Sequence, residues 1–422
     1  MRFLADFHIH SKYSRATSPN MNIPNLSLWA GYKGIGLMGT GDFTHHLWLQ
    51  ELKKHLTPLE GKGLLQYKGK QHFILTAEVS SIYTQNGKGY RVHNVLMAPS
   101  FKVVDEVNKA LGAIGNIVSD GRPILGISCI KLAELLFKIS PDIMLVPAHI
   151  WTPWFSVFGS ASGFDSLEEA YGKYTGKITA LETGLSSDPA MNWRLSQLDR
   201  FSLISNSDSH SPQKIGREAN AFECEMDYWE IKKILETKDK NKFLFTVEFF
   251  PEEGKYHFDG HRVCGVRLDP QATKKNNGIC PKCKKPLTLG VMYRVEELAD
   301  RPLGFVPENA IPYKSMVPFD EIIAEALGVA KTSKAVAAEY LKYVTTVAPE
   351  FYILGKMPEE ELFKKLPEKI ALGVKNVREG KVEALAGYDG EYGVIKTLSK
   401  QKEIIKPVGP ISTDKGEQLT LF

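Results

Sequence analysis

Two histidines stand at alternate positions near the start of the chain. Asp6, His8 and His10 are separated by the apolar residues Phe7 and Ile9. Side chains on a strand alternate between its two faces, so the three polar residues share one face. Two imidazoles at this spacing can reach one metal ion or two neighbouring ions, and mixed imidazole and carboxylate ligands suit Zn, Mn or Fe better than Mg alone. The segment therefore indicates part of a metal site.

Residues of the same chemical types recur further along the chain. Nearly all fall where a short β-like run ends, and one lies within such a run: they are Asp42, Glu78, His93, His149, Glu182, Asp208 and His210. A single histidine on a strand is most often an ordinary core or surface residue. So many potential ligands at equivalent positions are not expected by chance, and the set as a whole predicts a multinuclear metal centre.

The elements that must position these residues alternate along residues 1–248. Helical patterns are found at 46–56, 103–114 and 129–137, and β-like runs are found at 1–10, 34–42, 72–83, 91–98, 143–151, 177–184 and 200–210. This alternation predicts βα units with parallel strands, in a barrel or a doubly wound sheet. In both architectures the active site lies at the carboxyl ends of the strands, where the candidate ligands are found.

The composition excludes several classes of protein. The chain has 422 residues, of which 43% are hydrophobic and 24% charged, as expected for a globular protein of two or three domains. It has no apolar run long enough for a transmembrane helix, and its first residues do not read as a secretory signal, so we expect a cytoplasmic, nucleoid-associated protein with no membrane partner. The net charge of +4 permits nucleic-acid binding without requiring it.

A second metal site is predicted beyond residue 248. His261 and Cys264 form one closely spaced pair and Cys280 and Cys283 another, which is typical of a closed tetrahedral zinc site. His257 is an alternative to His261. One structural zinc would hold together a small module that lacks a core of its own.

Two groups of residues are candidates for contact with DNA. The zinc-binding segment is strongly basic, with only Asp269 as an acid among Arg262, Arg267, Lys274, Lys275, Lys282, Lys284 and Lys285. Such a charge suits a phosphate backbone, although a solvated charged surface is the alternative. Trp151 and Trp154 follow His149, and aromatic side chains beside a hydrolytic site can stack on bases. A loop packed on the first domain would explain them equally well.

The candidate ligands of the first domain resemble those of the PHP (polymerase and histidinol phosphatase) superfamily. The resemblance is carried by His8-x-His10, GTGDFTH at 39–45, Glu78, His93, His149, Glu182 and Asp208-x-His210. It implies a distorted seven-stranded β/α barrel over residues 1–248 that binds two or three divalent metals (Zn, Mn or Mg) and hydrolyses phosphoesters. Two departures stand out: either Asp42 or His45 replaces the histidine of the second motif, and SRAT at 14–17 occupies the place of an acidic residue.

This resemblance also implies roles for individual residues. Asp208, Glu78 and His149 are the expected catalytic residues, with Glu78 bridging two metals and Asp208 binding one of them. His149 and His210 would complete the metal shells, and Asp6 would be a direct or indirect partner of the metals. Arg15, Arg91 and Arg217 are candidates for holding the phosphate, and a surface position or a structural ion pair would explain each of them equally well.

The rest of the chain divides by composition. We expect a zinc-binding module at 249–300, a helical region for DNA or lesion recognition at 301–406, and a flexible tail at 407–422. The tail ends in QLTLF, which resembles the peptide that bacterial replication proteins insert into the sliding clamp. The clamp-binding residues would then be Gln418, Leu419, Leu421 and Phe422.

The ordered set of motifs along the whole chain resembles the endonuclease Q family, and within it a bacterial member. The set comprises the barrel, the finger at 256–283, LADRP at 298–302, AIPY at 310–313, VREGKVEAL at 377–385 and GYDGEYG at 387–393. The resemblance implies hydrolysis of the phosphodiester 5′ to uracil, hypoxanthine, xanthine or an abasic site. A PHP-type small-molecule phosphoesterase and an inactive DNA-binding repair factor are the alternative hypotheses.

Overall fold

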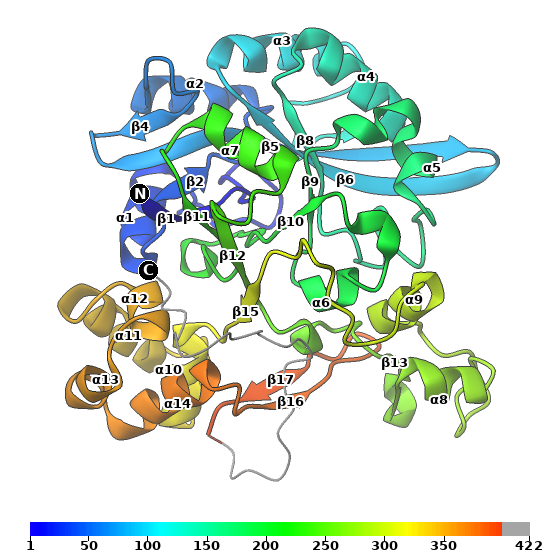
Figure 1. The fold of residues 1–422 in the computed structure, drawn as a ribbon, viewed down its shortest axis with the longest axis vertical. Coiled ribbons are helices and arrows are strands. Elements are labelled where there is room, and N and C mark those ends of the chain that lie inside the picture. Colours follow the sequence, from blue (N-terminus) through cyan, green and yellow to red (C-terminus); the bar gives the residue numbers. More distant parts are fainter. Residues whose placement is uncertain (399–422) are drawn as a thin grey trace.

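The computed structural model describes residues 1–398 (Figure 1). The predicted clamp-binding residues Gln418, Leu419, Leu421 and Phe422 lie outside the described residues. Within residues 1–398, no helix is both long enough and apolar enough to cross a membrane.

The first part of the chain is built around a mixed sheet of eleven strands. Its central strands β1 (Arg2–Asp6), β2 (Leu37–Gly39) and β5 (Gln71–Gln85) are parallel, as the βα pattern predicts. β11 (Ala219–Glu223) pairs with β1 and is antiparallel to it, and β12 (Phe243–Glu248) continues the sheet beyond β11. The remaining strands are β3 (Thr57–Pro58), β4 (Leu65–Tyr67), β6 (Lys88–Ala98), β7 (Ile124–Leu125), β8 (Met144–Pro147) and β15 (Tyr313–Ser315).

A separate parallel pair, β9 (Ala180–Glu182) and β10 (Ser202–Ile204), lies beyond β8. The backbone N–H of Thr179, just before β9, donates to the carbonyl of Leu145 in β8 at 3.4 Å. The strands thus follow one another around the molecule in the order β1, β2, β5, β6, β8, β9, β10. This pairing gives a mixed α/β architecture but does not by itself establish the closed seven-stranded barrel implied by the resemblance.

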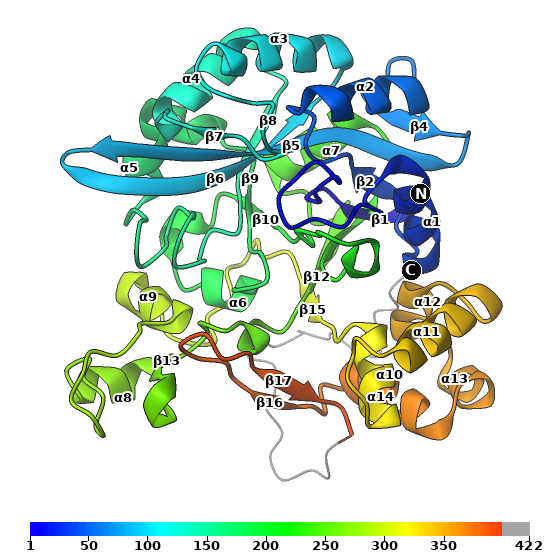
Figure 2. The ribbon, with the colours of Figure 1, turned by 180° about the vertical axis from the view of Figure 1, so that it is seen from behind.

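The longest strands form a hairpin rather than a parallel βα unit. β5 and β6 are antiparallel from Leu75 opposite Ala98 to Gln85 opposite Lys88. Asn86 and Gly87 between them both have positive φ, 51° and 77°, which is the geometry of a two-residue type I′ turn. The Asn-Gly dipeptide is the sequence signal for this turn. The hairpin extends beyond the body of the molecule (Figure 2).

Helices cover the sheet, and most begin at a capping side chain. Ser100 caps α3, Ser128 caps α4 and Asp227 caps α7, each accepting a backbone N–H of the first turn. The helices of this part are α1 (Ile23–Lys33), α2 (His46–His55), α3 (Phe101–Gly112), α4 (Cys129–Ile139), α5 (Leu167–Tyr171), α6 (Pro189–Asn192) and α7 (Tyr228–Thr237). Short 3-10 turns lie at Gly172–Lys177, Ser196–Leu198 and Pro212–Lys214.

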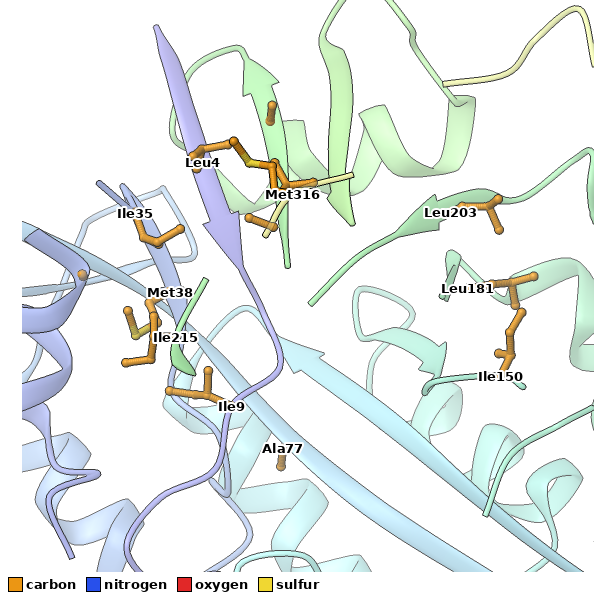
Figure 3. Packing of buried hydrophobic residues seen from close by; sticks show 14 of the residues in the cluster. Leu4, Ile9, Ile35, Met38, Ala77, Ile150, Leu181, Leu203, Ile215 and Met316 are labelled. Carbon is orange, nitrogen blue, oxygen red and sulfur yellow. The ribbon is translucent and has the colours of Figure 1, made fainter. Parts of the chain in front are cut away.

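The apolar core lies directly beneath the candidate metal ligands. Next to each of several candidate ligands stands an apolar residue that is fully buried: Ile9, Ala77, Ile150 and Leu181 (Figure 3). Alternation along the chain therefore sends one side chain into the core and the next toward the site. Burial of such side chains stabilises the fold by about 1.5–3 kcal/mol each.

The zinc-binding segment is an insertion between two adjacent strands of the main sheet. It leaves the sheet after β12 and returns at β15, which is parallel to β12 with Thr246 opposite Tyr313. The expectation that the chain is helical from about 301 is therefore wrong up to Pro318, because residues 313–315 complete the sheet. The insertion holds β13 (Asp259–His261), β14 (Val266–Leu268), α8 (Pro270–Lys275), α9 (Val291–Leu298) and 3-10 turns at Pro251–Glu253 and Arg262–Cys264.

A helical unit follows, joined to the first part by a buried ion pair. Nζ of Lys33, at the end of α1, lies 2.5 Å from Oε2 of Glu350, and both side chains are buried. The hydroxyl of Tyr340 donates to the same carboxylate. The helices are α10 (Phe319–Leu327), α11 (Lys334–Thr346), α12 (Glu350–Gly355), α13 (Glu359–Lys365) and α14 (Glu368–Arg378). The hairpin of β16 (Glu383–Leu385) and β17 (Val394–Lys396) ends the described chain beside the zinc-binding segment (Figure 2).

Candidate metal centre

Strand ends and strained turns bring the candidate ligands together. His8 and His10 follow β1, Glu78 and His93 lie on neighbouring strands of the long hairpin, and His149 and Asp208 follow β8 and β10. His149 and Asp208 have positive φ values of 30° and 46°, and Asp42 has 48°. For residues other than glycine this backbone costs about 1–3 kcal/mol and is concentrated at functional sites.

The side chains converge in two groups that share one carboxylate. In the first, the donor atoms of His8, His10, Glu78 and Asp208 all lie within 4.8 Å of one another. In the second, the same holds for Glu78, His93 and His149. Nε2 of His10 lies 3.2 Å from Oε2 of Glu78, and Nε2 of His149 lies 3.1 Å from its Oε1. Glu78 therefore presents one oxygen to each group, which is the arrangement of a carboxylate between two metal ions.

Four buried atoms at the centre make no hydrogen bond of regular geometry within the described residues. They are Nε2 of His8, Nε2 of His10, Nδ1 of His93 and Oδ1 of Asp208. They face one another instead: Nδ1 of His93 lies 2.5 Å from Oε1 of Glu78, and Nε2 of His10 lies 3.1 Å from Oδ1 of Asp208. Buried polar atoms nearly always make regular hydrogen bonds, so four such atoms aimed at one place require an explanation. Imidazole nitrogens and carboxylate oxygens are ligands for divalent metals, and the donor set fits Zn, Mn or Fe.

Asp42 and Glu182 contact the Nδ1 atoms of His10 and His8, on the side of each ring away from the centre. Nδ1 of His10 lies 3.0 Å from Oδ1 of Asp42, and Nδ1 of His8 lies 3.0 and 3.1 Å from the two oxygens of Glu182. Each carboxylate thus accepts the Nδ1 proton and leaves Nε2 facing the centre. This carboxylate–histidine arrangement orients metal ligands and increases their basicity. In this geometry Asp42 and Glu182 are partners of ligands rather than ligands.

SRAT at 14–17 stands where an acidic residue was expected, and its Ser14, together with Ser11, is hydrogen-bonded to Asp42. Oδ2 of Asp42 accepts the backbone N–H of Ser11 at 2.6 Å and the hydroxyls of Ser11 and Ser14 at 2.7 and 2.9 Å. The two serines therefore fix the carboxylate that orients His10.

Two further candidates lie beside the centre without joining either group. His45 is buried, directly precedes α2 as its N-cap residue and stacks on Tyr13 with ring centroids 4.5 Å apart. The ring of His210 lies 4.4 Å from that of His10, but its Nδ1 donates to the carbonyl of Asp208 at 3.0 Å. The positive φ of Asp208 interrupts the strand alternation that would place Asp208 and His210 on one face.

Asp6 supports the centre from a distance. Its oxygens accept the backbone N–H groups of Ser207 and Gly216 at 3.1 and 2.9 Å, so it holds the loop that carries Asp208. Burial raises the pKa of Asp6 to about 6, and these hydrogen bonds oppose the increase.

The electrostatics of the centre keep its carboxylates ionised. Burial alone would raise the pKa of Glu78, but the neighbouring His93, Arg122 and His8 hold it well below its usual value. Burial would also raise the pKa of Asp208, but the neighbouring His8 and His10 lower it below its usual value. Burial lowers the pKa of His93 to about 4 although Glu78 opposes this shift, so its imidazole is neutral and able to bind a metal.

Arg122 is a residue of the centre that the sequence did not reveal. Its Nη1 lies 3.1 Å from Oε2 of Glu78. It stands in a turn, SDGRP at 119–123, whose composition carries no signal for a metal centre. Of the arginines expected to hold phosphate, Arg217 donates to the carbonyl of Ser207 at 2.9 Å, Arg15 is exposed and Arg91 lies over the ring of Phe155.

The cysteine-rich segment forms the predicted second site. The donor atoms of His261, Cys264, Cys280 and Cys283 lie within 4.8 Å of one another, which fits a structural zinc. The apolar cluster beside them is small, with Val266 and Leu287 packed around Cys280. His257 lies outside the group and is buried, which lowers its pKa to about 4. The structure therefore favours His261 over His257.

The residues expected to contact DNA differ in their exposure. Trp151 is only 1% exposed and donates through Nε1 to Asn192, so the expectation that it stacks on a base is corrected: it packs in the core. Trp154 is 41% exposed. Among the basic residues of the zinc segment, Arg262, Lys274 and Lys275 are exposed. Arg267 is also exposed but donates to the carbonyl of Ala386, so it contributes to packing as well as to charge.

The chain is similar to two solved structures over nearly its whole length. One is the crystal structure of the lesion-specific endonuclease PfuEndoQ from Pyrococcus furiosus, with 33% identity and a TM-score of 0.84 over 95% of this chain and 98% of that one. The other is a complex of Endonuclease Q with a 27-mer duplex substrate that has an abasic lesion at the active site. It has 33% identity and a TM-score of 0.82 over 96% of this chain and 100% of that one.

Two sequence relatives and one family model also match the chain. The protein MJ0043 of Methanocaldococcus jannaschii is 34% identical over 263 residues, 60% of this chain but only 32% of that longer protein. The protein YqxK of Bacillus subtilis is 28% identical over 413 residues, 94% of this chain and 99% of that one. Residues 318–381, which include the helices α10 to α14, match the family model of the MJ0043 C-terminal domain.

Proposed function

Because the chain belongs to the endonuclease Q family, we propose that it is a metal-dependent endonuclease that cuts DNA at damaged nucleotides. The observation that carries the proposal is the pair of ligand groups sharing Glu78, whose buried donor atoms converge without regular hydrogen bonds. Such a centre is suited to hydrolysis of a phosphodiester. The two similar structures support the choice of substrate, since one is described as lesion-specific and the other holds duplex DNA with an abasic lesion.

The lesions are deaminated bases, namely uracil, hypoxanthine and xanthine, together with abasic sites, and the cut falls on their 5′ side. An enzyme that reads a base while it cuts the adjoining phosphate must expose that base, which favours extrusion of the nucleotide from the duplex. Trp154 is exposed, follows His149 by five residues in the chain and is a candidate for stacking on DNA.

Two or three divalent ions, Zn, Mn or Mg, would be held at the centre. His8, His10, Asp208 and Glu78 would hold one of them, and Glu78, His93 and His149 would hold another. Bound metals supply Lewis acidity toward the phosphate and the attacking water. His45 and His210 lie close enough to the centre to be the candidates for completing the shells or holding a third ion.

The remaining residues of the centre orient and fix these groups. Asp42 and Glu182 hold the protons on Nδ1 of His10 and His8, so that Nε2 of each ring is a ligand. Asp6 fixes the loop of Asp208. Since Nδ1 of His210 donates to a backbone carbonyl, its Nε2 carries the lone pair. The side chain of His210 is partly exposed, so this nitrogen is a candidate proton acceptor.

The zinc module provides the DNA-binding charge. Its exposed basic residues Arg262, Arg267, Lys274 and Lys275 contact phosphates, and each such contact adds to the salt dependence of binding. The terminal residues Gln418, Leu419, Leu421 and Phe422 bind the replication sliding clamp. Deleting 418–422 should abolish retention on immobilised clamp, and unchanged retention would remove this part of the proposal.

One experiment tests the function directly. The protein is incubated with Mn, Mg or Zn and matched duplexes that contain uracil, hypoxanthine, an abasic site or no lesion, and the ends of the products are mapped. We expect cuts 5′ to each lesion, no cut in the undamaged duplex, and no activity in Asp208→Asn. Hydrolysis of simple phosphomonoesters with all duplexes left intact would favour a small-molecule phosphoesterase. Specific binding without any hydrolysis would favour an inactive repair factor.

A further inference from the structure

Arg122 is unusual among the basic residues of the molecule. Within residues 1–398 it is the one lysine or arginine that forms an ion pair with a carboxylate of the metal centre, with Nη1 3.1 Å from Oε2 of Glu78. The other partners of Glu78 are imidazoles that serve as candidate ligands. A guanidinium has no lone pair and cannot bind a metal. Its place at the centre therefore needs another explanation.

The backbone around Arg122 is fixed by the residues that orient the ligands. The N–H of Gly121 donates to the carbonyl of Tyr13 at 3.1 Å, and its own carbonyl accepts the hydroxyl of Thr44 at 3.0 Å. A Cβ at Gly121 would lie 2.3 Å from Oγ of Ser14 and 2.4 Å from Oδ2 of Asp42. The turn thus packs directly against the Asp42 network, which fixes the backbone from which Arg122 extends, and the ion pair with Glu78 positions its guanidinium. A charge positioned in advance costs little reorganisation during a reaction.

The exposure of the charged groups shows where a substrate can approach. The side chains of Glu78 and His10 have no exposed surface, and that of His8 is almost fully enclosed. The side chains of Arg122 and Asp208 are 30% and 27% exposed. The side chain of His210, beside His10, is 33% exposed. A phosphate that reaches the centre from solvent therefore meets a cationic side chain, an anionic side chain and an imidazole. The cation offers it N–H donors, whereas the anion repels it unless a metal is bound there.

We propose that Arg122 binds a non-bridging oxygen of the scissile phosphate and stabilises the charge that builds on it. This inference rests on the proposed phosphodiester hydrolysis. In that reaction the oxygen of water bonds to phosphorus and one P–O ester bond breaks. One proton of the water is released, and the departing oxygen takes up a proton. Arg122 keeps its own protons throughout and supplies charge and hydrogen bonds, for which its planar fork is suited.

The test compares Arg122→Met and Arg122→Lys with Arg2→Met as a matched control. Arg2 pairs with Glu223 on the surface, at the opposite end of β1 from the centre, so its loss removes the same charge far from the site. Hydrolysis is measured on a uracil duplex and on bis(p-nitrophenyl) phosphate, which needs no lesion recognition. Calorimetry with Mn measures metal affinity, and uracil duplexes with a single phosphorothioate at the scissile position test the contact itself.

We expect Arg122→Met to lower kcat by on the order of 10²–10³-fold on both substrates while Mn affinity stays close to wild type. Arg122→Lys should recover part of the rate, and Arg2→Met should match wild type. In wild type, one phosphorothioate isomer should be cut more slowly because sulfur accepts hydrogen bonds poorly. In Arg122→Met that difference should largely disappear.

Two results would overturn the inference. One is a loss of Mn affinity that matches the loss of rate, with the phosphorothioate effect unchanged, since Arg122 would then only neutralise Glu78. The other is an Arg122→Met variant as active as wild type. If wild type hydrolyses bis(p-nitrophenyl) phosphate but no damaged duplex, the proposed function fails while Arg122 is still tested. If wild type hydrolyses neither substrate, both proposals fail.

Discussion

Nδ1 of His10 lies 3.0 Å from Oδ1 of Asp42, on the side of the imidazole ring opposite the metal-facing Nε2. The relationship predicts that Asp42→Asn retains the fold but weakens metal binding, because an amide does not hold the Nδ1 proton as a carboxylate does. Such partners typically account for 10–100-fold in metal affinity, so calorimetry with Mn should show a loss of about that size. Metal affinity equal to wild type would show that Asp42 has no part in orienting His10. Complete loss of one ion would instead identify Asp42 as a ligand.

The close packing of Gly121 leads to a second prediction. In Gly121→Ala the new methyl group would overlap Oγ of Ser14 and Oδ2 of Asp42, both of which sit in a fully hydrogen-bonded network. Overpacking of this kind costs about 1–3 kcal/mol of stability. Gly126→Ala is the control, because nothing lies within 4 Å of a Cβ there. Thermal unfolding should separate the two variants, and equal melting temperatures would contradict the packing argument.

The zinc module should depend on Cys280 and not on His257. Cys280 is fully buried at the centre of a small apolar cluster, so Cys280→Ser should lose one Zn per chain and unfold the segment around it. Metal analysis after dialysis gives the Zn content, and limited proteolysis locates the unfolded segment. His257→Gln should keep its Zn, since His257 lies outside the ligand group. Loss of Zn in that variant would reverse the assignment of the histidine.

The buried ion pair of Lys33 and Glu350 should matter for stability mainly when only one partner is removed, because the other charge then stays buried without a counter-charge. Glu350→Gln leaves the ammonium of Lys33 buried without its counter-charge, and breaking such a pair typically costs about 3–5 kcal/mol. The double variant Lys33→Met with Glu350→Gln removes both charges, keeps a side-chain acceptor for Tyr340 and Phe319, and should recover much of this loss. Denaturant unfolding of the three proteins measures the effect. A double variant less stable than Glu350→Gln alone would contradict it.

The raised pKa of the buried Glu248 predicts that the stability of the protein depends on pH. Burial raises its pKa from 4.5 to about 8. The folded protein therefore holds a proton that the unfolded chain releases between these two values. The stabilisation is complete below pH 4.5 and is lost as the pH rises toward about 8, at no more than about 1.4 kcal/mol per pH unit. Melting temperatures from pH 5 to 9 should fall more steeply for wild type than for Glu248→Gln. Parallel curves would show that Glu248 does not titrate in this range.

Much of the first part of the molecule was predictable from its strand pattern. Each β-like run contains an observed strand. Ligands that follow strand ends, His8, His10, His149 and Asp208, meet Glu78 and His93, which lie within β5 and β6, in the two groups. The spacing of His261, Cys264, Cys280 and Cys283 likewise predicted their cluster. These features follow from the spacing of residues that are close together in the chain, and this spacing can be read from the sequence.

Other features depend on contacts between distant segments. Whether Asp42 binds a metal or orients His10 depends on partners such as Ser11 and Ser14, whose hydroxyls donate to its second oxygen. Arg122 reaches Glu78 across 44 positions of the chain from a turn of ordinary composition. Trp151 and Trp154 look alike in the sequence, but one lies in the core and the other at the surface. No local pattern distinguishes these outcomes, because tertiary packing determines them.

The pairing of β15 with β12 has a practical consequence for dissecting the protein. A fragment that ends at residue 248 would contain every residue of the metal centre and yet lose the strand that covers the edge of its sheet. Thr246 and Val247 would then expose unpaired backbone groups, and an exposed sheet edge promotes aggregation. Recombinant fragments should therefore extend at least to Ser315. The zinc module must be kept in them or replaced by a linker, because it lies between the two paired strands.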